Sequence, residues 1–131
     1  MTNVYRDLSV IPIVYRLETA LTPKKSADLL PGTLDLLVLR TLVREPMHGY
    51  GIAERVKDLS HDVLQVGESS LYPALQRLLL DGYVEATWGV SDNNRRARYY
   101  ALTAAGRKKL VVERKEFDRI ITAIQTVLEF A

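Results

Sequence analysis

The stretch SSLYPALQRLLLDGYVEATW, residues 69–88, changes from the hydrophobic period of a helix to that of a strand. In its first part, apolar residues recur at spacings of three and four, which predicts a helix with one buried face formed by Leu71, Ala74, Leu75, Leu78 and Leu79. Ser69 or Ser70 is the expected N-cap, and Asp81 and Gly82 end the helix. From residue 83 the pattern alternates, so a strand follows, with one face formed by Val84, Ala86 and Trp88.

Two shorter helices are predicted before this stretch. Pro31 and Gly32 precede the first, whose expected buried stripe is Leu34, Leu37, Val38, Thr41 and Leu42. The segment EPMHGYG, residues 45–51, interrupts the pattern with one proline and two glycines. Helical spacing then resumes up to residue 60, with Ile52, Val56 and Leu59 on the buried face.

A second strand and a basic turn are predicted after residue 88. The turn formers GVSDNN, residues 89–94, lead into RARYYALT, residues 96–103, in which Tyr100 and Leu102 share one face. Arg95, Arg96 and Arg98 fall at this hairpin turn, and no acidic residue occurs from residue 93 to residue 112. The net charge of +2 and the pI of about 8.9 are only mildly basic, so the positive charge is concentrated in this segment rather than spread over the chain. The arginine cluster indicates either phosphate contacts or an ordinary solvated turn.

A long helix is predicted at the C-terminus, with Thr103 as its N-cap. Its apolar residues fall on a heptad stripe that is interrupted by Glu113 and Arg114 and consists of Leu110, Phe117, Ile120, Ile121, Ile124, Val127, Leu128 and Ala131. Because a small domain cannot cover so long a stripe, we expect a partner, most simply a second copy of the chain. Arg107, Lys108 and Lys109 are either a second phosphate contact or the polar face of this helix.

The length of 131 residues fits one domain with appendages, which we divide into an N-terminal extension (1–28), a central domain (29–102) and a dimerisation helix (103–131). The extension is expected to be a short helix over residues 14–21 or a poorly ordered tail. Its apolar run at residues 8–15 is far shorter than the roughly 20 residues that a membrane span needs. The absence of cysteine excludes disulfides and thiolate chemistry and fits a cytoplasmic protein.

Catalytic and cofactor patterns find little support. The adjacent residues Ser60, His61 and Asp62 cannot adopt the geometry of a catalytic triad, and two histidines without a carboxylate cluster do not predict a metal site. No phosphate-binding loop of the G-x-x-x-x-G-K type occurs. We therefore expect no enzyme, no metal and no cofactor.

The order of three helices, a hairpin and a long helix predicts a mainly α-helical chain with a small β-hairpin, a winged helix-turn-helix followed by a dimerisation helix. Three blocks carry a family resemblance: PGTLDLLVLRTLVREPMHGYGIAERV, SSLYPALQRLLLDGYVEATW and RRARYYALTAAGRKKL. Over about residues 29–115 the chain resembles the PadR family of transcriptional regulators. The resemblance implies a homodimer, usually a repressor, that binds a pseudo-palindromic operator in double-stranded DNA and is released by a small, often aromatic, effector. The chain departs from the family in its N-terminal extension and in Leu79 and Leu80, where an acidic pair is common.

The winged-helix order assigns candidate DNA contacts, each with a structural alternative. On the third helix the candidates are Ser69, Ser70, Tyr72 and Gln76, but the serines could only cap the helix and Tyr72 could only pack. At the start of the second helix, Tyr50 lies between glycines that favour either phosphate binding or a turn. On the wing the candidates are Arg95, Arg96 and Arg98.

Tyr99 and Tyr100 are expected to pack in the core and the hairpin. Trp88, Phe117 and Phe130 either line an effector cavity or belong to the core, and no effector-binding residues are identified. The alternative function is a winged-helix module that docks a different protein on its last helix and does not bind DNA.

Overall fold

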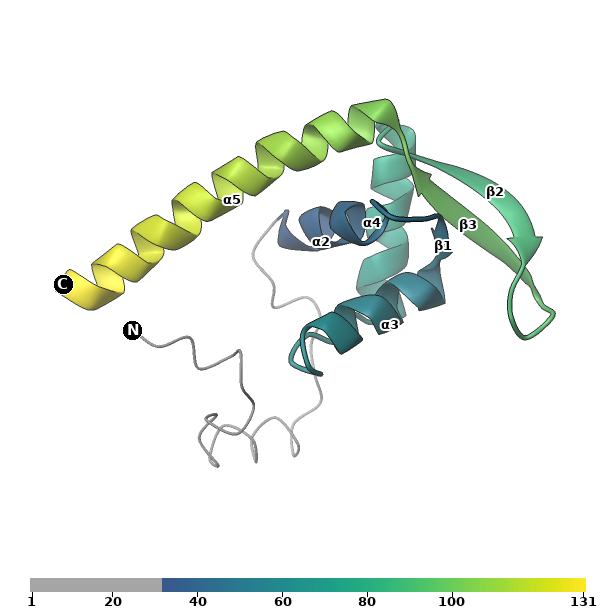
Figure 1. The fold of residues 1–131 in the computed structure, drawn as a ribbon, viewed down its shortest axis with the longest axis horizontal. Helices are drawn as coiled ribbons and strands as arrows, with labels where there is room; N and C mark the ends of the chain where they lie inside the picture. Colours follow the sequence, from purple (N-terminus) through teal and green to yellow (C-terminus); the bar gives the residue numbers. More distant parts are fainter. Residues whose placement is uncertain (1–31) are drawn as a thin grey trace.

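The computed structural model of the protein describes residues 32–131. Its elements, shown in Figure 1, are α2 (Thr33–Thr41), β1 (Met47–His48), α3 (Gly49–Leu59), α4 (Glu68–Leu80), β2 (Val84–Val90), β3 (Arg96–Leu102) and α5 (Ala104–Phe130). The extension predicted for residues 1–28, with its alternative helix at 14–21, lies outside the described residues. The predicted order of helices and hairpin is confirmed.

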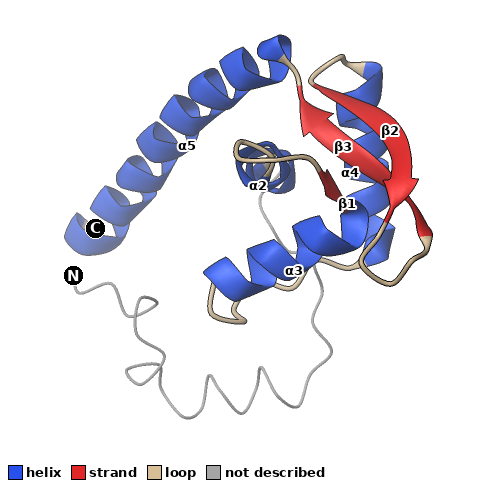
Figure 2. Ribbon diagram, turned by 45° about the vertical axis from the view of Figure 1, so that its right-hand side comes forward, coloured by secondary structure: helices blue, strands red, loops and turns tan. Residues whose placement is uncertain are grey.

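The sheet has three antiparallel strands in the order β1-β3-β2 (Figure 2). Strands β2 and β3 form the predicted hairpin, with Val84 opposite Leu102 at its base and Val90 opposite Arg96 near its turn. Strand β1 was not predicted. Its two residues pair with β3, Met47 opposite Tyr100, and so tie the start of α3 to the hairpin.

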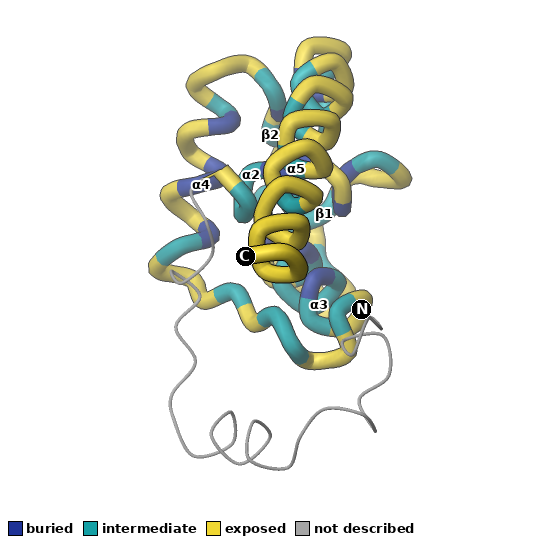
Figure 3. Tube along the Cα trace, turned by 90° about the vertical axis from the view of Figure 1, so that its left-hand side faces the viewer, coloured by how far each residue is buried: buried dark blue, intermediate teal, exposed yellow. Residues whose placement is uncertain are grey.

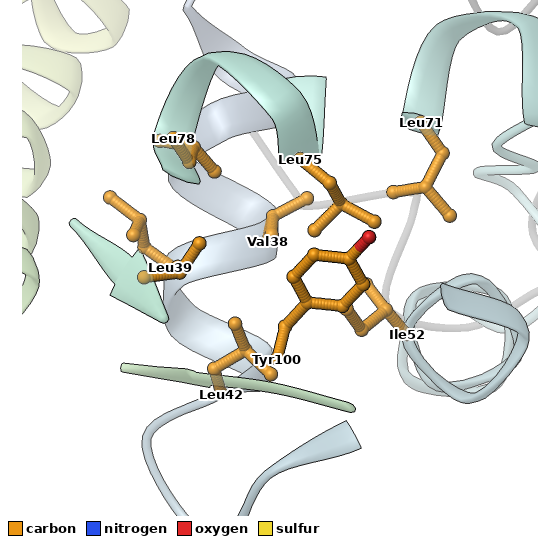
Figure 4. Close-up of a cluster of buried hydrophobic side chains, with 9 residues drawn as sticks. Val38, Leu39, Leu42, Ile52, Leu71, Leu75, Leu78 and Tyr100 are labelled. Carbon is orange, nitrogen blue, oxygen red and sulfur yellow. The ribbon is translucent and has the colours of Figure 1, made fainter. Parts of the chain in front are cut away.

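Side chains from α2, α3, α4 and the sheet meet in one core (Figure 4). The buried cluster consists of Val38, Leu39, Leu42, Ile52, Leu71, Leu75, Leu78, Val84 and Tyr100. Burial of these side chains from water is the main favourable contribution to folding. The core thus fixes α4 and the base of the hairpin relative to each other.

The buried face of α2 is wider than predicted. Leu36 and Leu39 are buried, whereas Leu34 and Leu37, expected in the stripe, are only half-buried. The reason is that α2 contacts α3, α4 and α5, so more than one side of it is covered. Thr41 is buried as predicted, and its hydroxyl donates a hydrogen bond to the Val38 carbonyl at 2.8 Å.

Two further expectations about helices are wrong. Leu59, the last residue of α3, remains 65% exposed and does not join the core. Helix α4 begins at Glu68, and its N-cap is Gly67 rather than Ser69 or Ser70, which lie in its first turn. The C-terminal end of α4 is as predicted, since Gly82 adopts a φ of 78° and donates its amide to the Leu79 carbonyl at 3.1 Å.

The start of α5 is attached to the base of the hairpin. Thr103 is the N-cap as predicted: its Oγ1 accepts a hydrogen bond from the Gly106 amide at 3.0 Å and donates one to the Gly82 carbonyl at 2.7 Å. Gly106 is buried, and a Cβ at this position would collide with the Tyr83 carbonyl oxygen. The long helix therefore leaves the domain in a defined direction, away from the hairpin (Figure 1).

Candidate nucleic-acid interface

The hairpin of β2 and β3 is the wing of a winged helix-turn-helix. The pairing of its strands places Val84, Ala86, Trp88 and Val90 on the same face as Leu102, Tyr100, Arg98 and Arg96. At the base this face is part of the core, where Val84 and Tyr100 are buried. Nearer the turn it is open, and Trp88 is 61% exposed. The face predicted for Trp88 is therefore correct, but its side chain lies beyond the core.

The three wing arginines do not all lie in the turn. The Ser91 amide donates to the Arg95 carbonyl at 2.7 Å, and Asn94 adopts a φ of 58°, so the turn closes at residue 95. Arg96 and Arg98 belong to β3 and share one face of the strand. The basic tip inferred from sequence is thus one turn residue plus two strand residues.

Aromatic rings, rather than carboxylates, are the neighbours of the strand arginines. The Arg96 guanidinium carbon lies 4.3 Å from the centroid of the Trp88 ring, and that of Arg98 lies 5.8 Å from the centroid of Tyr100. Within residues 32–131, the side chains of Arg95, Arg96 and Arg98 form no ion pair and donate no hydrogen bond. Their charges are therefore free to meet an external anion.

The start of α3 is shaped by packing. The amide of Gly51 donates to Nδ1 of the N-cap His48 at 3.0 Å, so this amide is already used within the protein. A Cβ at Gly49 would lie 3.0 Å from the ring of Tyr72, so the glycine admits that ring. Packing against Tyr72 accounts for Gly49, whereas Gly51 lies in the helix without a positive φ and a Cβ there would come no closer than 3.4 Å to its neighbours. Tyr50 projects into solvent beside them, 69% exposed.

The candidate residues of α4 differ in their exposure. Ser69 and Gln76 are exposed, and Ser70 is half-buried. Tyr72 packs against Gly49 yet remains 46% exposed, so it is both a packing residue and a surface residue.

A groove of about 750 Å³ lies between the wing and the starts of α3 and α4. It brings together five of the predicted DNA contacts, Tyr50, Tyr72, Arg95, Arg96 and Arg98, and its walls also include His48, Trp88, Asp92 and Tyr100. Ser69, Ser70 and Gln76 lie outside these walls. Trp88 was not among the residues predicted for this site, although the strand face that it shares with the two arginines could have indicated it.

Comparison with known proteins agrees with this geometry. The transcriptional regulator PadR-like family matches residues 38–112, more than half of the chain. The chain belongs to the PadR-like family of transcriptional regulators. An uncharacterized protein of Lysinibacillus sphaericus, protein X, is 33% identical over 107 residues, which cover 79% of this chain and 97% of that protein.

Solved PadR-family structures share the fold. A PadR family transcriptional regulator from Eggerthella lenta is 25% identical, with a TM-score of 0.66 over 91% of this chain and 95% of that one. A PadR family transcription regulator from Clostridium difficile is 26% identical, with a TM-score of 0.63 over 74% of this chain and 99% of that one. The predicted family and fold are confirmed.

In this PadR-like chain, most of α5 is exposed (Figure 3), and several of its exposed residues are large and apolar. Of the residues predicted for dimerisation, Leu110 packs against its own core. The other six become more exposed towards the C-terminus: Phe117 and Ile121 are half-buried, and Ile120, Ile124, Val127 and Leu128 are exposed. Four of these, with Ala123, line a shallow hollow of about 310 Å³ whose surface is entirely apolar.

Ion pairs also lie along α5. Lys109 contacts Glu113 at 2.8 Å, and this pairing raises the pKa of Lys109 above its usual value. Arg107 donates to the Val43 carbonyl at 3.4 Å. These contacts favour the interpretation of this basic cluster as the polar face of the helix. Further along, Arg119 pairs with Glu116 and lowers the pKa of that carboxyl group.

The three aromatic residues that were candidates for a core or a cavity do not come together. Trp88 is on the wing, and Phe130 is 82% exposed at the far end of α5, so neither is a core residue. Within residues 32–131, no group of three or more histidine or carboxylate side chains is placed to hold a metal ion. None of the helices in that range is long and apolar enough to cross a membrane.

Proposed function

We propose that this PadR-like protein is a homodimeric binding protein, rather than an enzyme, that regulates transcription by binding a pseudo-palindromic DNA site. Helix α4 would enter the major groove, and the wing would contact the adjacent backbone. The observation that carries the proposal is the groove in which three unpaired arginines face the starts of α3 and α4. Phosphate oxygens are the complementary ligands for such guanidinium groups.

The contacts are divided by their chemistry. Arg95, Arg96 and Arg98 would bind phosphates and so determine affinity and salt dependence without reading sequence. Gln76 and Ser69 are exposed on α4 and carry groups that form hydrogen bonds with base edges. Ser70, Tyr72 and Tyr50 would complete the contact at the ends of α3 and α4.

A second copy of the chain would cover the stripe of α5. The 27 residues of this helix extend for about 40 Å, and its exposed residues keep a heptad spacing. Two-fold symmetry would then place two copies of α4 about one helical turn of DNA apart, which matches a pseudo-palindrome.

We further propose that the bound dimer represses transcription in the cytoplasm. A small aromatic effector bound between the subunits would change the spacing of the two α4 helices and release the DNA. This part of the proposal rests on membership of the PadR-like family.

The test is fluorescence anisotropy with labelled duplexes. The purified protein is added to labelled duplexes, one from its own upstream promoter and one with a scrambled sequence, at salt concentrations from about 50 to 200 mM. We expect tighter binding to the promoter and a steep loss of affinity with salt. If neither duplex is bound at low salt, the proposal fails, and α5 becomes the docking surface of a protein-interaction module.

A further inference from the structure

Trp88 is an exposed tryptophan next to unpaired positive charge. It is the only tryptophan in the chain, it is 61% exposed, and it is not part of the core. Removing it should therefore have little effect on the stability of the fold. Its position on one face of the wing, directly opposite Arg98 and diagonal to Arg96, requires another explanation.

The contact between Trp88 and Arg96 is made with the aromatic ring and uses no oxygen or nitrogen acceptor. With the Arg96 guanidinium carbon 4.3 Å from the ring centroid, the planar group is close enough to stack on the indole. None of its N–H groups donates to another residue between 32 and 131. The guanidinium is therefore held against the ring while no acceptor within these residues takes its N–H groups, and phosphate binding requires such available donors.

Restriction of this side chain has a consequence for binding. A free arginine loses rotamer entropy when it is immobilised at an interface. A guanidinium already held against an indole loses less, so the same phosphate contact is stronger. Both residues line the groove beside α3 and α4, where the backbone of a bound duplex would run.

We propose that Trp88 is a positioning residue that holds the Arg96 guanidinium ready to bind a DNA phosphate. The proposal rests on the DNA-binding function proposed above and adds a residue that acts through Arg96. It would raise affinity for every duplex and would not select among sequences.

A double-mutant cycle tests this role, with affinity measured by anisotropy on the promoter and scrambled duplexes. Trp88→Leu should weaken binding to both about two- to five-fold, which corresponds to the strength of a cation–π contact at an exposed site. Trp88→Phe should retain part of the effect. In an Arg96→Ala background, Trp88→Leu should cause no further loss. Thr87→Ala, at an exposed position on the other face of β2 and outside the groove, is the control and should leave the affinity unchanged.

Two readouts separate positioning from a structural role. Trp88→Leu should leave the thermal unfolding midpoint and the salt slope unchanged, since no positive charge is removed, whereas Arg96→Ala should flatten the slope by about one phosphate contact. In the free protein, Arg96→Ala should shift the emission of Trp88, and Arg95→Ala should not.

The outcomes distinguish this inference from the proposed function. Equal losses from Trp88→Leu in both backgrounds, or no loss in either, would overturn the positioning role while DNA binding stands. Absence of binding by the wild-type protein at low salt would overturn both.

Discussion

Replacing Arg95, Arg96 and Arg98 together with alanine should weaken binding to every duplex and flatten its salt dependence. Within residues 32–131 none of these side chains is paired with a carboxylate, so each should count as a full positive charge against phosphate. Each phosphate contact contributes about 0.9 to the slope of log affinity against log salt. The slope of log affinity against log salt concentration should therefore be shallower in the triple variant by about 2.7 per protomer, and by about 5 in a dimer with both wings bound.

The assay is anisotropy on the promoter and scrambled duplexes from about 50 to 200 mM salt. Over that range a slope loss of about 2.7 corresponds to a factor of about 40 in affinity. The matched control is the triple alanine variant of Arg44, Lys108 and Lys115, which removes the same charge, likewise unpaired within residues 32–131, from exposed positions outside the groove and the apolar stripe. An unchanged slope in the wing variant, or an equal loss in the control, would refute the assignment of the wing to the phosphate backbone.

Four further changes test other parts of the account. Gln76→Ala should reduce the preference for the promoter over the scrambled duplex, by about 1–3 kcal/mol if it reads a base edge, as measured by competition anisotropy. Ile124→Glu should convert the dimer to a monomer in sedimentation velocity, because it places a charge in the apolar seam of α5. Gly106→Ala should lower stability in chemical denaturation by about 1–3 kcal/mol, because a Cβ there collides with a backbone carbonyl. Arg119 holds the pKa of Glu116 below its ordinary value of 4.5, so the stabilisation from this pair is present above that pH and is lost as pH falls through the lowered pKa. Thermal unfolding midpoints from about pH 5 to pH 2 should therefore fall less in Glu116→Gln than in the wild type.

Each of these changes has a control or a contradicting result. Equal loss on every duplex would count against base readout by Gln76. Val112→Glu adds the same charge to α5 outside the stripe and should leave the dimer intact. Ala105→Ser, at an exposed neighbour of Gly106, should leave stability unchanged. The pH result would be contradicted if Glu116→Gln and the wild type fell in parallel.

Local periodicity was sufficient to predict the large elements. The change of hydrophobic period within residues 69–88 predicted α4 and β2. Thr103 predicted the start of α5, because its capping hydrogen bond joins it to Gly106, only three positions away. Periodicity did not predict which residues are buried in a helix that is covered from several sides. Helix α2 buries Leu36 and Leu39 because three other helices contact it, and a single-stripe pattern cannot show this.

The sequence pointed to five residues that line the groove, but not to the way the groove is formed. Strand β1 has two residues, too few to show alternation, and its pairing with β3 depends on residues about fifty positions apart. The same long-range pairing places the start of α3 beside the wing and forms the groove. Trp88 was taken for a core or cavity residue because the sequence does not show how far the hairpin extends beyond the core.

A footprint of the purified protein on its own upstream promoter tests the central claim most directly. Protection from nuclease cleavage should appear at two half-sites about one helical turn apart, about 34–36 Å along the duplex, because a two-fold dimer presents two copies of α4. The protection should disappear in the Ile124→Glu variant, which lacks the second subunit. No protection at low salt, or one half-site protected equally by the wild type and this variant, would contradict the account of a dimeric sequence-specific regulator.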